Sequence, residues 1–70
     1  MNVIKGSRVK YIVESGDEAA KRVPIGTVLF ASVVRSCGDN VDVRWDRADI
    51  TGMDVECAMP AELFEVVVET

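Results

Sequence analysis

Three carboxylates that lie close together in the sequence are the first residues that could do chemistry. A cluster such as Asp46, Asp49 and Asp54 can bind a hard cation, and a pair of carboxylates can act as acid and base. Arg44 and Arg47 alternate with them, and the chain has neither the ligand spacing of a calcium-binding loop nor a glycine-rich phosphate loop. We therefore predict surface ion pairs between neighbouring strands, with no catalytic residues.

The side chains that most enzymes use near neutral pH are scarce. The chain has no histidine, which removes the usual general base and the commonest metal ligand. Its two cysteines, Cys37 and Cys57, cannot fill the four positions of a zinc site within one chain. We expect Cys37 to be exposed in a turn and Cys57 to be buried as a small apolar residue. We expect no metal, no cofactor and no enzyme activity.

Trp45 is the one tryptophan of the chain, and two roles are open to it. An exposed tryptophan could form the floor of a groove for a peptide or a methylated lysine. Val41, Val43 and Trp45 share one face of an alternating run, which favours a place in the core.

A charged stretch, Glu14–Pro24, follows the first alternating run. We predict a long exposed loop, because its central residues are too few to form a stable helix alone. An acidic loop at this place can bind basic residues of a proline-rich peptide, as in SH3 domains, although Lys21 and Arg22 partly neutralise it. A solvated loop without a ligand is the alternative. The acidic residues concerned are Glu14, Asp17 and Glu18.

Short alternating runs separated by turn residues must position these side chains, and they predict an all-β fold. The predicted strands are residues 8–13, 26–34, 41–46, 53–57 and 65–68, with a single helical or 3₁₀ turn at Pro60–Leu63 before the last strand. In the fourth strand we expect Met53, Val55 and Cys57 to share a face. Closure into a barrel would remove the exposed strand edges.

The second predicted strand is apolar on both faces, with Val28, Phe30 and Val34 on one and Leu29, Ala31 and Val33 on the other. Such a strand bends between two layers of a barrel. The face of Leu29, Ala31 and Val33 could belong to the core, or it could lie outside as a partner site or as the interface of a homo-oligomer.

Length and charge limit the function further. Seventy residues form a single domain, residues 1–70. The net charge is −4 and the basic residues are scattered, so nucleic-acid binding is not expected. The start of the chain is too charged for a signal peptide, and no segment is apolar enough to span a membrane. With only two cysteines, we expect a cytoplasmic protein.

Four segments, in this order and spacing, resemble the small SH3-like barrel families, including the KOW-type and Tudor-like domains. They are Lys5-Gly6-Ser7-Arg8-Val9, Gly26-Thr27-Val28, Val41–Asp46 and Pro60–Val66. The resemblance implies a five-stranded antiparallel SH3-like barrel with a binding role. The KOW resemblance leaves nucleic-acid binding as an alternative, through Arg8, Lys10, Lys21, Arg22, Arg44 and Arg47.

The later part of the chain is also similar to the plasmid-borne type II dihydrofolate reductases, which are small barrels assembled as tetramers. The segment Val55-Glu56-Cys57-Ala58 corresponds to their Val-Gln-Ile-Tyr pore strand, and Ala61-Glu62-Leu63 matches the turn after it. Because the Gln and Tyr are absent, and Glu56 would face an anionic substrate, this similarity implies an oligomeric barrel and argues against reductase activity.

These observations together favour a small non-catalytic binding module that contacts another protein. Its small size also fits an accessory protein of a phage or mobile element. The expected contact surface comprises the charged loop and the segment around the tryptophan: Glu14, Asp17, Glu18, Lys21, Arg22, Arg44, Trp45, Asp46 and Asp54.

Overall fold

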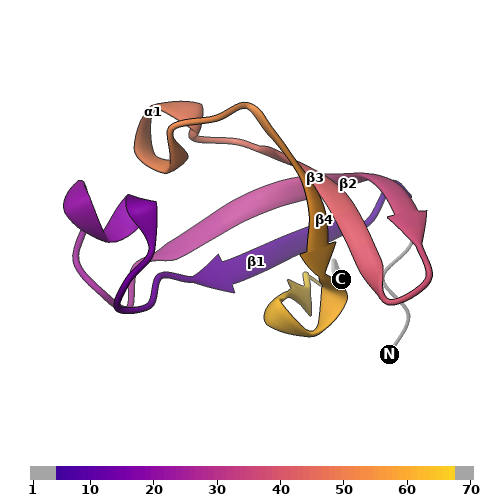
Figure 1. Cartoon of the computed structure of the whole chain (residues 1–70), viewed down its shortest axis with the longest axis horizontal. Coiled ribbons are helices and arrows are strands. Elements are labelled where there is room, and N and C mark those ends of the chain that lie inside the picture. Colours follow the sequence, from indigo (N-terminus) through magenta and orange to yellow (C-terminus); the bar gives the residue numbers. More distant parts are fainter. Residues whose placement is uncertain (1–4, 68–70) are drawn as a thin grey trace.

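A computed structural model describes residues 5–67, which form one five-stranded antiparallel sheet (Figure 1). The prediction of a small all-β fold with five antiparallel strands is confirmed, as is the 3₁₀ turn before the last strand. The strands are β1 (Arg8–Ile12), β2 (Val28–Cys37), β3 (Asn40–Trp45), β4 (Val55–Pro60) and β5 (Glu65–Val66). Three short helical turns connect them: η1 (Glu18–Lys21), α1 (Ala48–Thr51) and η2 (Ala61–Leu63). The predicted end of the last strand, Val68, lies outside the described residues.

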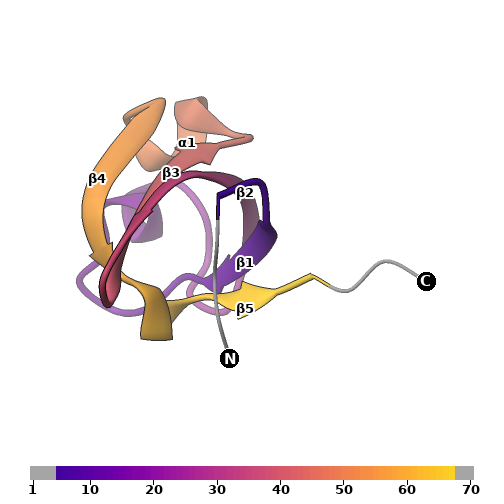
Figure 2. The same cartoon turned by 90° about the vertical axis from the view of Figure 1, so that its right-hand side faces the viewer.

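The strand order is β4-β3-β2-β1-β5, so the short last strand pairs with the first. The sheet curls around its core, and β4 and β5 lie at its two ends (Figure 2). No ladder joins β4 to β5 within residues 5–67. The expected removal of every strand edge is therefore not seen, and β4 remains an edge strand.

The core is formed by the alternating positions of the long strands. Val9, Val41 and Val43 are almost completely inaccessible to solvent, and Trp45 is only 5% exposed. Each side chain buried in this way stabilises the fold by about 1.5–3 kcal/mol relative to an exposed position. The prediction that Val41, Val43 and Trp45 share the core face is confirmed.

Only one of the two apolar faces of β2 is buried. Leu29, Ala31 and Val33 are buried, whereas Val28 and Phe30 are each 43% exposed. The reason is the register with β1, where Tyr11 and Val9 lie opposite Leu29 and Ala31. Directly opposed residues point to the same face, so the core residues of β1 determine which face of β2 is buried. Of the alternatives open for Leu29, Ala31 and Val33, the core is therefore the one observed, and the exposed apolar face is that of Val28 and Phe30.

The faces of β4 also differ from the prediction. Met53, Val55 and Cys57 are exposed, whereas Glu56 lies opposite the buried Val43 and is partly buried. The burial of Cys57 was therefore predicted wrongly.

A β-bulge follows Glu56 in β4. The register with β3 shifts between Val41 and Val43, and Ala58 adopts a φ of 57°. An extra residue in one strand changes which side chains share a face. As a result Glu56 and Met59, three positions apart, both lie opposite core residues of β3.

The predicted loop after β1 and the connection after β3 each contain a helical turn. The loop after β1 carries η1, whose Ala19 is buried, and the connection after β3 carries α1, whose Thr51 is buried. Arg22, which directly follows η1, donates a hydrogen bond from Nη1 to the carbonyl oxygen of Ile50 at 3.2 Å. This bond joins the two turns over one end of the sheet, so the loop after β1 is partly packed. Among the described residues, no helix is both long and apolar enough to cross a lipid bilayer.

Candidate functional site

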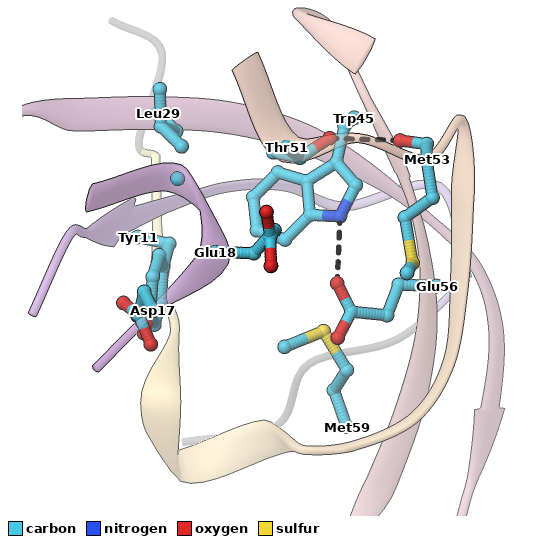
Figure 3. Close-up of a pocket in the computed structure, with 10 residues that line it drawn as sticks. Tyr11, Asp17, Glu18, Leu29, Trp45, Thr51, Met53, Glu56 and Met59 are labelled. Atoms are coloured by element: carbon cyan, nitrogen blue, oxygen red, sulfur yellow. Dashed lines mark hydrogen bonds between the residues drawn. The ribbon is translucent and has the colours of Figure 1, made fainter. Parts of the chain in front are cut away.

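A cavity of about 120 Å³ lies between the sheet and the two helical turns (Figure 3). Trp45 of β3 and Tyr11 of β1 contribute aromatic surface. Carboxylates enter from two sides, since Glu18 comes from η1 and Glu56 from β4 (Figure 3). The lining residues are Tyr11, Asp17, Glu18, Ala19, Leu29, Trp45, Thr51, Met53, Glu56 and Met59. The pocket therefore combines an apolar body with acidic groups.

The aromatic side of the pocket is fixed by packing among three rings. The Tyr11 and Trp45 rings meet edge to face with centroids 5.9 Å apart, and Phe64 lies 5.8 Å from Tyr11 and 5.9 Å from Trp45. Such pairs contribute about 0.5–1.5 kcal/mol each beyond the area that they bury. The tryptophan is thus a core residue that also lines the pocket.

Glu56 is held in the pocket by the tryptophan. Trp45 Nε1 donates a hydrogen bond to Glu56 Oε1 at 3.1 Å. Within residues 5–67, no lysine or arginine forms an ion pair with this carboxylate. A partly buried carboxylate thereby faces an aromatic cavity with a hydrogen bond from the indole and with no cationic partner in the described part of the chain.

Asp17 is a second carboxylate of the pocket, and it organises the loop after β1. Its Oδ2 accepts hydrogen bonds from Tyr11 Oη at 2.5 Å and from the backbone N–H of Glu14 at 2.8 Å. Burial, and then the bond to Asp17, raise the pKa of the Tyr11 phenol well above its usual value, so the phenol stays protonated as a donor. Within the described part of the chain, Asp17 also lacks a cationic partner.

Glu18, by contrast, is shared between two cations of its own loop. Lys21 Nζ lies 3.3 Å from its Oε1, and Arg22 Nη1 lies 3.5 Å from its Oε2. All three side chains are exposed, so these ion pairs are weak. The role of Arg22 is mainly to hold the η1 wall of the pocket against α1 through its bond to Ile50.

The structure therefore separates the predicted contact residues into two groups. Asp17, Glu18 and Trp45 line the pocket, and Glu14, Lys21 and Arg22 support its loop wall. Arg44, Asp46 and Asp54 do not line the pocket.

Two of the ion pairs among the described residues lie away from the pocket: one joins β3 to the residue before β4, as predicted, and the other is local to the connection that contains α1. Arg44 Nε lies 3.9 Å from Asp54 Oδ2, and Arg47 Nη2 lies 2.8 Å from Asp49 Oδ2. The hydrogen bond from Arg47 keeps the pKa of Asp49 below its usual value.

Asp46 pairs with Arg8 of β1, whereas Arg44 and Arg47 were the arginines expected beside it. Arg8 donates two hydrogen bonds to the Asp46 carboxylate. These bonds lower the pKa of Asp46. Across residues 5–67, no group of three or more potential metal ligands comes together.

Glu56 and Met59 were missed as pocket residues by reasoning from sequence. The alternation of apolar and acidic residues at positions 53–57 is regular, and it predicts the opposite face for Glu56. The bulge at Ala58 carries no glycine, so its usual sequence signal is absent. The local sequence pattern therefore contains no signal that identifies Glu56 as a pocket residue.

Comparison of the chain with protein-family models, with curated proteins and with solved structures finds no match. The function of the protein must therefore be inferred from the geometry and charge of the pocket.

Proposed function

We propose that this protein is a small non-catalytic binding module that takes a basic side chain, Lys or Arg, of a partner protein into the pocket. The single observation that carries the proposal is the partly buried carboxylate of Glu56, which faces the cavity without a cationic partner in residues 5–67. A cation that enters would gain a charge-assisted hydrogen bond with this carboxylate.

The rest of the pocket suits the same ligand. The aliphatic part of a Lys or Arg side chain can pack on Met53 and Met59, while its charged end reaches the carboxylates of Glu56 and Asp17. The nearby tryptophan and tyrosine rings offer a further attraction to a cation. This combination supports protein binding through charge and shape together.

The alternatives from the sequence have less support. Nucleic-acid binding needs free cations, whereas Arg8, Lys10 and Arg44 each pair with a carboxylate on the surface. A reductase-like site would have to hold an anionic substrate beside Glu56 and Asp17, which the charge opposes. A cytoplasmic location and an accessory role in a phage or mobile element remain parts of the proposal.

The test compares an arginine peptide with the same peptide carrying citrulline, which is nearly isosteric and neutral. Binding is followed by NMR through the indole N–H signal, which is unambiguous because the chain has one tryptophan. We expect the arginine peptide to shift this signal and the citrulline peptide to leave it in place.

The matched variants are Glu56→Gln and Asp54→Asn. Gln keeps an oxygen acceptor for Trp45 Nε1 while removing the charge in the pocket, and Asn removes one charge from a residue that does not line it. We expect Glu56→Gln to weaken binding about tenfold, as for loss of a charged hydrogen bond, and Asp54→Asn to change it less than about twofold. Equal effects of the two variants would mean that only net charge matters, and the pocket proposal would fail.

A further inference from the structure

The open edge of β4 runs along the same pocket. Within residues 5–67, β3 is the one strand paired with β4, and no strand lies on its other side (Figure 2). Two side chains of this edge strand, Glu56 and Met59, line the cavity. A segment that paired with this edge would therefore lie directly beside the pocket.

The hydrogen bonds of β3 and β4 identify which backbone groups face the open edge. Trp45 N–H donates to the carbonyl oxygen of Asp54 at 2.8 Å, so Asp54 directs its backbone groups toward β3. In an antiparallel ladder, successive residues direct their N–H and C=O to opposite sides. Val55 therefore directs its N–H and C=O away from β3. Glu56 lies opposite Val43 and directs its N–H and C=O toward β3. Val55 offers one donor and one acceptor to an added strand.

The same geometry determines where a basic side chain would go. On an added strand, the residue opposite Glu56 forms a non-hydrogen-bonded pair, in which the Cα atoms are about 4.5 Å apart and the side chains are close. Both side chains of such a pair point to the same face. A Lys or Arg at this position would therefore enter the pocket beside the carboxylate of Glu56. Its neighbour opposite Val55 would lie on the other face, where Val55 is 37% exposed.

We infer that an extended segment of the partner, with a basic residue between two apolar ones, pairs with the edge of β4 and places its basic side chain in the pocket. This inference rests on the proposed function and adds the backbone conformation and the side-chain pattern of the ligand. The bulge at Ala58 ends the regular part of the edge, so the paired segment is short.

Charge complementarity favours this occupant over a second copy of the chain. In a symmetric pairing of two β4 edges centred on Glu56, the two Glu56 carboxylates would lie opposite one another, and like charges at directly opposed positions are destabilising. A strand that carries a cation at the same position relieves the charge of the pocket. The edge is thus better suited to a foreign segment than to itself.

The experiment leaves the protein unchanged and modifies the peptide. The probe is an acetylated and amidated Thr-Val-Arg-Val-Thr peptide, together with two forms that carry an N-methyl group on the valine after the arginine or on the arginine itself. In an antiparallel pairing, the valine N–H would donate to the carbonyl oxygen of Val55, whereas the arginine N–H would face away from β4. The two forms have the same composition and charge, so each controls for the other.

We expect N-methylation of the valine to weaken binding at least tenfold and N-methylation of the arginine to change it less than about twofold. We also expect the parent peptide to slow hydrogen exchange at the amide of Val55. The citrulline form of the parent peptide distinguishes the two proposals. If arginine is required but both N-methyl forms bind equally and Val55 exchange is unchanged, the edge inference fails and the pocket proposal stands. Absence of binding by the arginine peptide at millimolar concentration would overturn both.

Discussion

Substitutions at Ala58 test the bulge that brings Glu56 and Met59 to the pocket. Ala58 is exposed and has a φ of 57°, and it is the one non-glycine residue with a positive φ among residues 5–67. Holding an L-residue in this left-handed conformation costs about 1–2 kcal/mol. Glycine avoids most of that cost, but it loses about 0.5–1 kcal/mol more conformational entropy on folding.

We therefore expect Ala58→Gly to raise the free energy of unfolding by about 0.5–1 kcal/mol. For a domain of this size, such a change raises the melting temperature by about 4 °C. Ala58→Val should lower the stability by about 1 kcal/mol or more, because a β-branched side chain tolerates a positive φ least. Since the side chain is exposed, lost packing does not complicate either comparison.

The assay is urea unfolding followed by the fluorescence of Trp45, which is buried and has no second tryptophan to obscure it. Cys57 supplies the control, because it is also exposed on β4 and has no positive φ. There, valine should be the more stable substitution and glycine the less stable one, as in ordinary strands. If Ala58→Gly is destabilising in the same way as Cys57→Gly, the left-handed residue is absent. The explanation for Glu56 and Met59 sharing the pocket would then be wrong.

Two further predictions concern the core and its tyrosine. Val43→Ala should lower the free energy of unfolding by about 2 kcal/mol in the same urea assay, because it removes two methyl groups from a position with no exposed surface. Val28 is 43% exposed, so Val28→Ala should lower the free energy of unfolding by less than half as much. The pKa of Tyr11 is higher in the folded than in the unfolded protein, so its contribution to stability is complete below about pH 10 and is lost as the pH rises further. Unfolding measured at pH 8 and pH 11 should show this loss, with absorbance at 295 nm reporting the one phenolate, and Tyr11→Phe should reduce it. An equal pH dependence in Tyr11→Phe would assign the loss to other groups.

Several features of the fold follow from local patterns in the sequence. The alternation of Val41, Val43 and Trp45 with charged residues is sufficient to assign β3 and its core face, because only one face is apolar. Pro60 likewise precedes the 3₁₀ turn η2, as its fixed φ and missing N–H favour. The family resemblance and the oligomeric state stay predictions.

The pocket itself depends on pairing between distant segments. Both faces of β2 are apolar, so its own sequence cannot decide which face is buried, and the register with Val9 and Tyr11 makes that choice. In β4 the alternation points to the wrong face, because the position opposite Val43 and the bulge at Ala58 override it. A period of two residues identifies which side chains share a face, and it identifies the core face where only one face is apolar; in β2 and β4 the neighbouring strand determines which face meets the core. That is why the sequence was sufficient to predict the strands and the core position of Trp45, while only the tertiary structure showed that Glu56 lies beside Trp45.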